Sequence, residues 1–388
     1  MMICPCLIAL ITITQISEDI NPNITTKNTN KTPENTLFLT IGTGIVDCDG
    51  EDISSKGRIL LFEVNRTNRT DNIKVTSIKV SLCYSKDILL GPVTSLNCLS
   101  CDCKNRLVLG AGAEITVEQW SQGKLTQVGF FHANMQVKNI VLFKTFFLLS
   151  DAYDSIHFLV WRESDKSLTL LAKDYEPMPI YATGLLSRGP SVSFVCHDDR
   201  QNLQFFSYSP NDAAARGGNR LVPRADFHLG QQMVSLHTHY CRSGSIIHSA
   251  TPKSTIEASK GRDLYSILPD DDRRLGLHFG TTDGAIGSII PLNENTYWRL
   301  AALQSVLGNA LEGDGALSHR AWRLYRRSIR RGGCRSNDRK KGVIDGDLAV
   351  RYVDLPLAEQ EDLASSIGST MDMILDNLRE VNCGGMFV

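Results

Sequence analysis

Residues 107–120 read LVLGAGAEITVEQW, in which a strand-like run ends in small residues and an alternating run ends in an aromatic residue. A third run, Lys124 to Phe131, follows after a short polar turn. Runs rich in β-branched and aromatic residues, separated by turn-forming residues, are typical of antiparallel strands. This stretch therefore predicts one small sheet of three or four strands.

The same pattern recurs along the chain. Further copies cover residues 145–173, 191–227 and 275–292, and an earlier copy surrounds Ile59. When the copies are aligned on one shared apolar position, the successive steps are 41, 47 and 83 residues, between Ile115, Ile156, Leu203 and Ile286. A period of about 40–50 residues is typical of propeller blades. The sequence therefore predicts a mainly β fold, a partial β-propeller of about five WD40-like four-stranded blades over residues 37–294.

Three other segments complete the predicted organisation. The long last step is explained by an insertion, Arg242 to Arg274, which is expected to form a surface loop. After residue 294 the period changes, and Leu300, Leu303 and Leu307 fall on one helical face, which predicts a small α-helical domain over residues 295–388. Residues 1–36 are expected to be a disordered leader. Five blades without a closing strand suggest part of a larger ring, which would leave a sheet edge and apolar surface exposed.

Composition is typical of a soluble globular protein, with 42% hydrophobic and 21% charged residues. The 41 basic and 42 acidic side chains nearly cancel, so no global charge attracts nucleic acid. Eleven cysteines are too sparse for a disulfide scaffold, which favours free thiols and an intracellular protein. The apolar run Cys6 to Thr14 is far shorter than the ~20 residues of a membrane span, and no basic residue precedes it. The sequons at Asn23 and Asn30 leave a secreted glycoprotein as a minor alternative.

No catalytic motif is present in the sequence, and neither an enzyme nor a small-molecule substrate is expected. The glycine-rich segment Ile41 to Ile45 is not followed by a helix-like pattern, so a blade turn is predicted there. Asp283 precedes a glycine and is predicted to be a turn residue. His237, His239 and Cys241 would share one face of a strand. Because a second ligand element is missing, a half-buried strand is predicted rather than a metal site, and no cofactor is expected.

The sharpest charge feature is the segment 320–341, called here the basic run, which has a single acid, Asp338. Its interleaved aromatic residues, Trp322 and Tyr325, suit base stacking, and its cations suit phosphate contacts. Contact with RNA, contact with an acidic protein partner and a solvated helix face all remain open, and the run also resembles a nuclear localisation signal. The candidate binding residues are Arg320, Arg323, Arg326, Arg327, Arg330, Arg331, Arg335, Arg339, Lys340 and Lys341.

Several long motifs, in order, resemble one known family. They are GRILLFEV at 57–64, GGNRLVPRADFHLG at 217–230, DGAIG at 283–287 with Pro291 and YWRL at 297–300, and DGDL at 345–348 with RY at 351–352 and IGST at 367–370. From about residue 37 to near the C-terminus, the chain resembles the C-terminal portion of the large subunit of the cleavage and polyadenylation specificity factor. That family also includes the large UV-damaged-DNA-binding protein and a splicing factor 3b subunit.

The resemblance implies a nuclear, non-catalytic scaffold for cleavage and polyadenylation of pre-mRNA. In that family the propellers hold a WD-repeat subunit and a zinc-finger subunit that recognise the poly(A) signal. Pre-mRNA would be contacted directly or through these partners, without a membrane. A damaged-DNA or ubiquitin-ligase adaptor, or a splicing-factor scaffold of the related branch, is the alternative.

Overall fold

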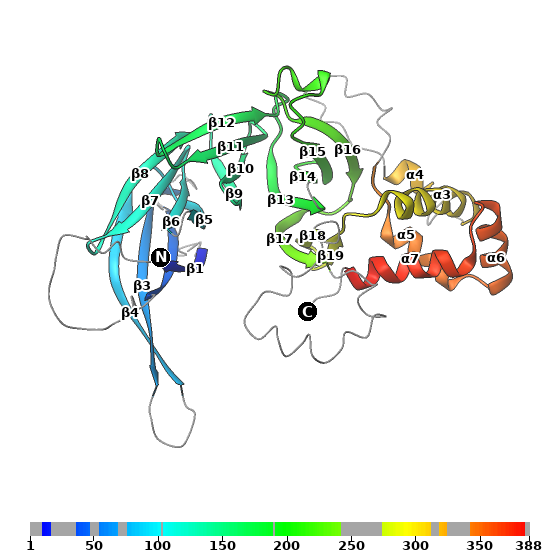
Figure 1. The fold of residues 1–388 in the computed structure, drawn as a ribbon, viewed down its shortest axis with the longest axis horizontal. Coiled ribbons are helices and arrows are strands. Elements are labelled where there is room, and N and C mark those ends of the chain that lie inside the picture. Colours follow the sequence, from blue (N-terminus) through cyan, green and yellow to red (C-terminus); the bar gives the residue numbers. More distant parts are fainter. Residues whose placement is uncertain are drawn as a thin grey trace, which may run out of the picture. The chain divides into compact units, whose positions relative to one another are not determined.

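A computed structural model of the chain describes residues 10–16, 36–46, 54–68, 76–101, 104–188, 191–241, 274–311, 318–323 and 342–384. Contacts divide the chain into two compact units, unit 1 at residues 1–180 and unit 2 at residues 181–388. Unit 1 contains strands β1 to β12 (Figure 1). Unit 2 contains the remaining strands, apart from the first residue of β13, and all the described α-helices.

Unit 1 consists of three four-stranded antiparallel sheets, and in each sheet the strands lie side by side in chain order. This arrangement is that of propeller blades. The first blade contains β1 (Leu10–Ile16), β2 (Thr36–Val46), β3 (Ser54–Asn68) and β4 (Thr76–Ile88). The second contains β5 (Val93–Cys101), β6 (Lys104–Ala111), β7 (Glu114–Ser121) and β8 (Lys124–His132). The third contains β9 (Val137–Phe143), β10 (Phe146–Asp151), β11 (Ile156–Arg162) and β12 (Ser167–Lys173).

The blades of unit 1 pack through apolar faces that alternate along each strand. Ile59 and Leu61 of β3 are fully buried in the core between the first and second blades, where Trp120 also packs. On the opposite face of the first blade, Phe62 lies across from Leu82, which is 55% exposed. The second and third blades both lie on the Ile59 side, so the described part of unit 1 leaves this second apolar face uncovered by a sheet. An uncovered apolar face agrees with an incomplete propeller.

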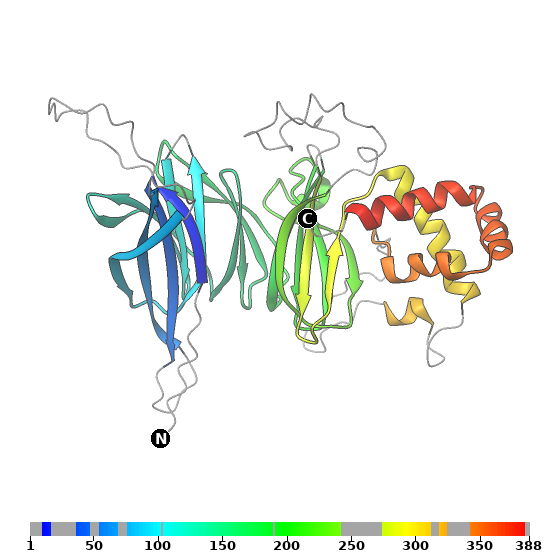
Figure 2. The same cartoon turned by 90° about the horizontal axis from the view of Figure 1, so that it is seen from below.

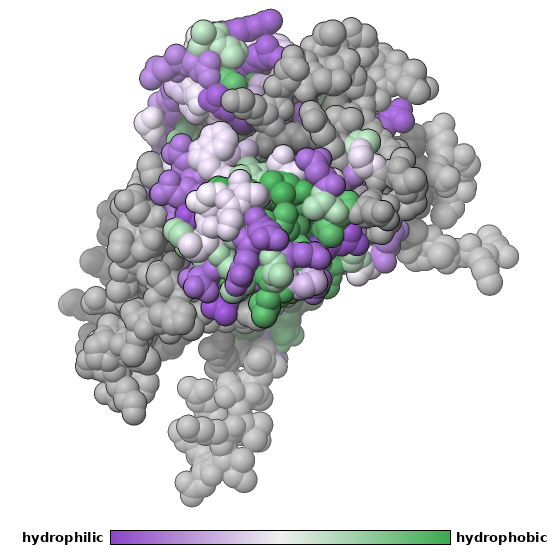
Figure 3. Space-filling model, turned by 90° about the vertical axis from the view of Figure 1, so that its right-hand side faces the viewer, coloured by the Kyte–Doolittle hydropathy of each residue, from purple (hydrophilic) through white to green (hydrophobic). Residues whose placement is uncertain are grey.

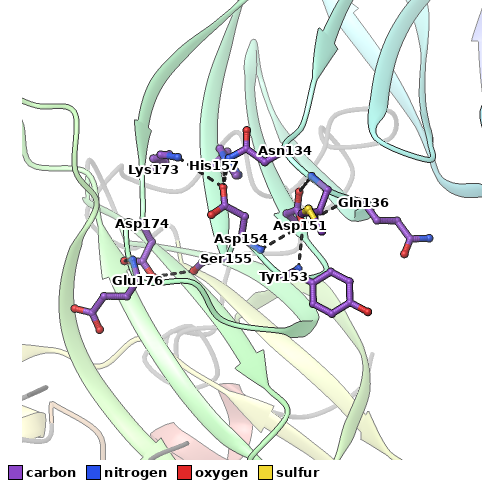
Figure 4. Close-up of polar contacts among 11 residues, drawn as sticks. Asn134, Gln136, Asp151, Tyr153, Asp154, Ser155, His157, Lys173, Asp174 and Glu176 are labelled. Carbon is purple, nitrogen blue, oxygen red and sulfur yellow. Dashed lines mark hydrogen bonds and ion pairs between the residues drawn. The ribbon is translucent and has the colours of Figure 1, made fainter. Parts of the chain in front are cut away.

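A buried carboxylate holds the turn of the third blade against the loop that precedes the blade. Asp151, at the end of β10, accepts hydrogen bonds from the backbone N–H of Met135 (2.8 Å) and of Tyr153 (3.0 Å). Figure 4 shows its carboxylate among these donors, with Gln136 on the side of the β8–β9 loop. One side chain thus satisfies backbone groups of the β10–β11 turn and of the loop that connects the second blade to the third.

Unit 2 begins with the fourth and fifth blades, which share one seven-stranded sheet. The strands β13 and β18 join the two blades through two residue pairs at their ends. The fourth blade contains β13 (Ile180–Arg188), β14 (Ser191–Asp198), β15 (Asn202–Ser207) and β16 (Val222–His228), with the short helix η1 (Ala213–Ala215) before β16. The fifth contains three described strands, β17 (Met233–Cys241), β18 (Arg274–Thr281) and β19 (Ile286–Ile289).

The predicted repeat is confirmed strand by strand. The aligned apolar residues all lie in the third strand of their blades, at Ile59, Ile115, Ile156, Leu203 and Ile286. None of the described sheets closes on itself, so the mainly β fold is a partial propeller, as expected. Most of the predicted insertion, residues 242–273, lies outside the described residues, but Arg274 belongs to β18.

Two local predictions are wrong. Residues Leu10–Ile16, which were expected in a disordered leader, form strand β1 and pair with β2. The glycine-rich segment from Ile41 to Ile45 is not a blade turn, because it lies within β2. A Cβ atom on Gly42 would overlap the side chains of Val93 and Leu96 in β5. The glycine therefore allows the second blade to approach the first, which is a recognised use of glycine inside a strand.

After β19 the chain forms a group of helices in unit 2 (Figure 2). They are α3 (Glu294–Ala310), α4 (His319–Trp322), α5 (Gly346–Val350), the 3₁₀ turn η5 (Arg351–Asp354), α6 (Leu357–Ser366) and α7 (Met371–Gly384). Leu300, Leu303 and Leu307 form the predicted buried face of α3 and pack with Tyr352 and Ile374. Among the helices that the structure describes, none combines the length and the apolar character needed to cross a bilayer.

The fourth blade uses the same type of buried turn carboxylate as the third. Asp198, at the end of β14, accepts hydrogen bonds from the backbone N–H groups of Arg200 and Asn202, both at 2.9 Å. The neighbouring His197 is fully buried, and its Nε2 accepts a hydrogen bond from the backbone N–H of Met233 at 3.1 Å. Since Met233 begins β17, this neutral imidazole ties the fourth blade to the fifth.

We expect His197 to make unit 2 less stable in acid. Burial, with a smaller contribution from the nearby His228, lowers the pKa of His197 from 6.5 to about 4. The unfolded chain therefore binds the proton first, and the stabilisation that is complete above pH 6.5 is lost as the pH falls towards 4. In urea unfolding at pH 7 and 4.5, the free energy of unfolding should fall by about 2–3 kcal/mol more for the native chain than for His197→Gln. Equal losses in the two proteins would contradict this assignment, because every other titratable group is present in both.

Candidate partner interface

The first part of the basic run forms a short, well-capped helix. Ser318 precedes α4, and its Oγ accepts a hydrogen bond from the backbone N–H of Ala321 at 3.1 Å, as a helix N-cap does. The helix ends at Trp322, and Arg323 is its C-cap. Arg320 lies within α4, but its side chain is outside the described residues.

Arg323 is a buried anchor, and its predicted role as a surface cation is wrong. Its exposed fraction is 5%, and its Nε donates to Oδ2 of Asp345 at 2.6 Å. Its Nη1 donates to the backbone carbonyls of His228 (3.3 Å), the last residue of β16, and of Leu229 (2.9 Å). The guanidinium also lies over the rings of Trp322 and Phe227, with centroid distances of 3.9 and 4.8 Å. One side chain therefore joins α4, the end of the fourth blade and α5.

Asp345 is the other half of this anchor. It is the N-cap of α5, and it also accepts a hydrogen bond from Nε2 of His319 at 2.6 Å. Its own backbone N–H donates to the side-chain carbonyl of Gln304 in α3, at 2.6 Å. Burial alone would raise the pKa of Asp345, but the charge of Arg323 and the hydrogen bonds from His319 and Arg323 outweigh burial and lower it. Asp345 is therefore a carboxylate at neutral pH, paired with Arg323.

A broad groove of about 1440 Å³ lies beside this ion pair, within unit 2. Phe205, Phe227 and Phe279 from the blades form part of one wall, and α3 and α5 contribute to the other. Two apolar side chains of the lining are strongly exposed, Ile286 at 70% and Trp298 at 55%. The groove is larger than the ~300–1,000 Å³ pockets that suit small ligands, so its size fits a protein segment better.

Most of the predicted binding residues cannot be placed. Eight of the ten lie outside the described residues, and their role stays a prediction: Arg326, Arg327, Arg330, Arg331, Arg335, Arg339, Lys340 and Lys341. Arg323, which precedes these eight residues, and Gly342 to Asp347, which follow them, line the groove.

The predicted turn residue Asp283 and the predicted histidine strand lie in ordinary structural contacts. The turn predicted at Asp283 is confirmed, because the backbone N–H of Gly284 donates to the carbonyl of Thr281 at the β18–β19 hairpin. His239 of β17 stacks on His278 of β18, with ring centroids 3.6 Å apart. Within the described ranges there is no cluster of three or more side chains arranged to hold a metal ion.

The sequence motifs meet in the groove, although no single motif identified it. Its lining includes Phe227 of the 217–230 motif, Ile286 of DGAIG, Trp298 of YWRL, and Asp345 and Asp347 of DGDL. These segments are far apart in the sequence, so only the fold brings them together. In the sequence, the only indication that these motifs belong to one surface was that they all resemble the same family.

Comparison with known proteins agrees with that resemblance. The family profile described as "CPSF A subunit region" matches residues 18–354. The chain belongs to this family. It is 32% identical to the probable cleavage and polyadenylation specificity factor subunit 1 of Oryza sativa subsp. japonica, over 94% of this chain and 23% of that protein. It is 32% identical to subunit 1 of Arabidopsis thaliana, over 92% and 22% of the two chains, and 28% identical to that of Drosophila melanogaster, over 89% and 22%. The chain thus spans less than a quarter of the length of these family members, which are named as subunits of a processing factor.

We predict that the Arg323–Asp345 pair is essential for the packing of the helices against the blades. Arg323→Ala should lower the free energy of unfolding of unit 2 by about 3–5 kcal/mol, because it leaves the buried Asp345 carboxylate without its counter-charge and removes a donor from two carbonyls. Denaturant unfolding measures this loss, and the exposed Arg200→Ala is the matched control. The double variant Arg323→Met/Asp345→Asn should lose less than the sum of its single variants. Additive losses would show that the two side chains do not act as a pair.

Proposed function

We propose that this chain acts as a non-catalytic scaffold in the nuclear complex that cleaves and polyadenylates pre-mRNA. In this role it holds the WD-repeat and zinc-finger subunits that recognise the poly(A) signal. Membership of the CPSF A subunit family supports the proposal, as do the names of the relatives. The observation that carries it is the groove of unit 2, where four family motifs line one surface with exposed apolar side chains.

The groove has the features of a protein-docking surface. Ile286 and Trp298 are large apolar side chains that remain largely exposed beside a rigid wall of buried aromatic residues. Large apolar side chains that become buried in the centre of an interface carry much of its binding energy. The ion pair between Arg323 and Asp345 keeps both walls in place before a partner arrives, which lowers the entropy lost on binding.

A pull-down with purified subunits tests the docking role of the groove. We expect the native chain to retain the WD-repeat and zinc-finger subunits, and Ile286→Asp to weaken this association by at least ~10-fold, because a charge then enters an apolar interface. The matched control is Val234→Asp, since Val234 is an aliphatic residue of similar exposure, 62%, that does not line the groove. Equal association of the two variants would remove the groove from the mechanism. Retention of a ubiquitin-ligase or splicing subunit instead would favour the related branch.

We further propose that the basic run contacts RNA. Its ten Lys or Arg residues face a single acid in the sequence, and Arg323 anchors the start of the run to the fold. Phosphate contacts by Lys and Arg release counterions, so such binding weakens steeply as salt increases.

A filter-binding titration in increasing salt tests this contact. Replacing Arg326, Arg327, Arg330 and Arg331 together by Gln should weaken binding to single-stranded RNA and reduce its salt slope by up to ~0.7 per lost phosphate contact. Arg162, Lys138, Lys124 and Arg200, also replaced by Gln, form the control set. If RNA affinity is unchanged but a protein subunit is lost, the run binds an acidic partner; if neither changes, it is a solvated face.

A further inference from the structure

Three exposed apolar side chains lie within one stretch of eight residues at the C-terminal helices, and only the first of them lines the groove. Val350, Val353 and Leu357 are 39%, 50% and 68% exposed. The end of unit 2 that carries the helices shows hydrophobic side chains among hydrophilic ones (Figure 3). Scattered single apolar residues are normal on a surface, but adjoining ones mark interaction sites. These three residues are called the apolar triad below.

Helix geometry and hydrogen bonds hold the backbone segments that carry the triad. Because α5 continues directly into η5, Val350 and Val353 lie three residues apart on one side of a continuous helical segment. The buried side chain of Gln360 donates to the carbonyls of Val353 (3.2 Å) and Leu355 (2.7 Å), and so binds α6 to η5. Leu357 precedes Gln360 by about one helical turn, which places it on the side of α6 that faces Val353.

The surroundings of the triad are acidic. Residues 342–384 contain nine Asp or Glu and only two Arg, although the whole chain has a net charge of −1. The side chain of Asp347 is 96% exposed, and Asp354 is exposed directly after Val353. Together with burial, the charge of Glu361 raises the pKa of Tyr352, so Glu361 lies close to η5. Within the described residues, five acids of this segment are in no ion pair: Asp354, Glu359, Glu361, Asp362 and Asp372.

We propose that the apolar triad and the carboxylates around it form a docking surface for a basic amphipathic segment of a partner protein. Apolar side chains of that segment cover Val353 and Leu357, and its Lys or Arg residues pair with the carboxylates of η5 and α6. The same carboxylates repel RNA and anionic lipid, which leaves a protein as the occupant. This surface adjoins the groove at Val350 and Asp347, but its proposed occupant and its test are independent of those proposed for the groove.

Fluorescence anisotropy with the full chain and a labelled peptide tests the surface. The probe is an 18-residue peptide of Leu and Lys with Leu at helical i, i+3, i+4 and i+7 spacing, and its comparison is the same peptide with Glu in place of Lys. We expect the Lys peptide to bind at least ~10-fold tighter than the Glu peptide, and more weakly as salt increases. Equal binding of the two peptides would overturn the proposal.

Variants locate the binding on the chain. Leu357→Lys and Val353→Lys should each weaken the Lys peptide by ~10-fold, and both side chains are exposed enough to leave the fold intact, as circular dichroism would show. The matched control is Met373→Lys, because Met373 is an apolar side chain of α7 that is 47% exposed and outside the triad. Equal effects of the triad and control substitutions would overturn the proposal.

Two further outcomes identify other occupants and would also overturn it. If replacing Arg326, Arg327, Arg330 and Arg331 by Gln strengthens peptide binding, the chain's own basic run already occupies the surface. If the native chain forms dimers in sedimentation that Leu357→Lys abolishes, the occupant is a second copy. The groove variant Ile286→Asp should bind the Lys peptide as the native chain does, so failure of this proposal and failure of the groove remain distinguishable.

Discussion

The buried ion pair between Arg323 and Asp345 joins the last blades of unit 2 to its helices. Each partner also satisfies groups that would otherwise be buried without a hydrogen bond: Arg323 binds the carbonyls of His228 and Leu229 at the end of β16, and Asp345 caps α5. A buried pair is weak evidence for stability by itself, because desolvation offsets much of its Coulombic gain. Its contribution here is positional, since the pair links the end of β16 to the start of α5.

A second constraint acts at the turns of the blades. Asp151 and Asp198 each end the second strand of a blade and bind backbone N–H groups of the turn that follows. In the second blade, Gly112 occupies this turn with a φ of +56°, and a Cβ atom there would overlap the carbonyl oxygen of Leu90. The turn between the second and third strands is thus held by a buried carboxylate in the third and fourth blades. In the second blade the same turn contains a glycine, which has no side chain to obstruct close packing. Repeated architecture therefore does not require a repeated residue.

This variety explains what sequence reasoning reached and what it missed. The apolar positions of the third strands, such as Ile115 and Leu203, repeat because the first four blades bury them, so their period revealed the fold. The position in the fifth blade, Ile286, instead lines the groove and is 70% exposed. Gly42 was misassigned because glycine permits both a turn and a close approach of strands, and only the neighbouring blade decides between them. Arg323 resembled its neighbours in the basic run, since its burial depends on Asp345, which is 22 residues away in the sequence.

Charge is separated along the C-terminal part of the chain, although the whole chain is nearly neutral. The basic run carries ten cations against one acid, and residues 342–384 carry nine acids against two cations. Arg323 and Asp345 come one from each segment, and they are the pair that the fold buries. The remaining charges of the two segments are opposite in sign, which favours different partners for each and disfavours the wrong one. Under the proposed function, such a division would help the chain to hold both a polyanion and proteins, because each partner would be repelled from the segment that binds the other.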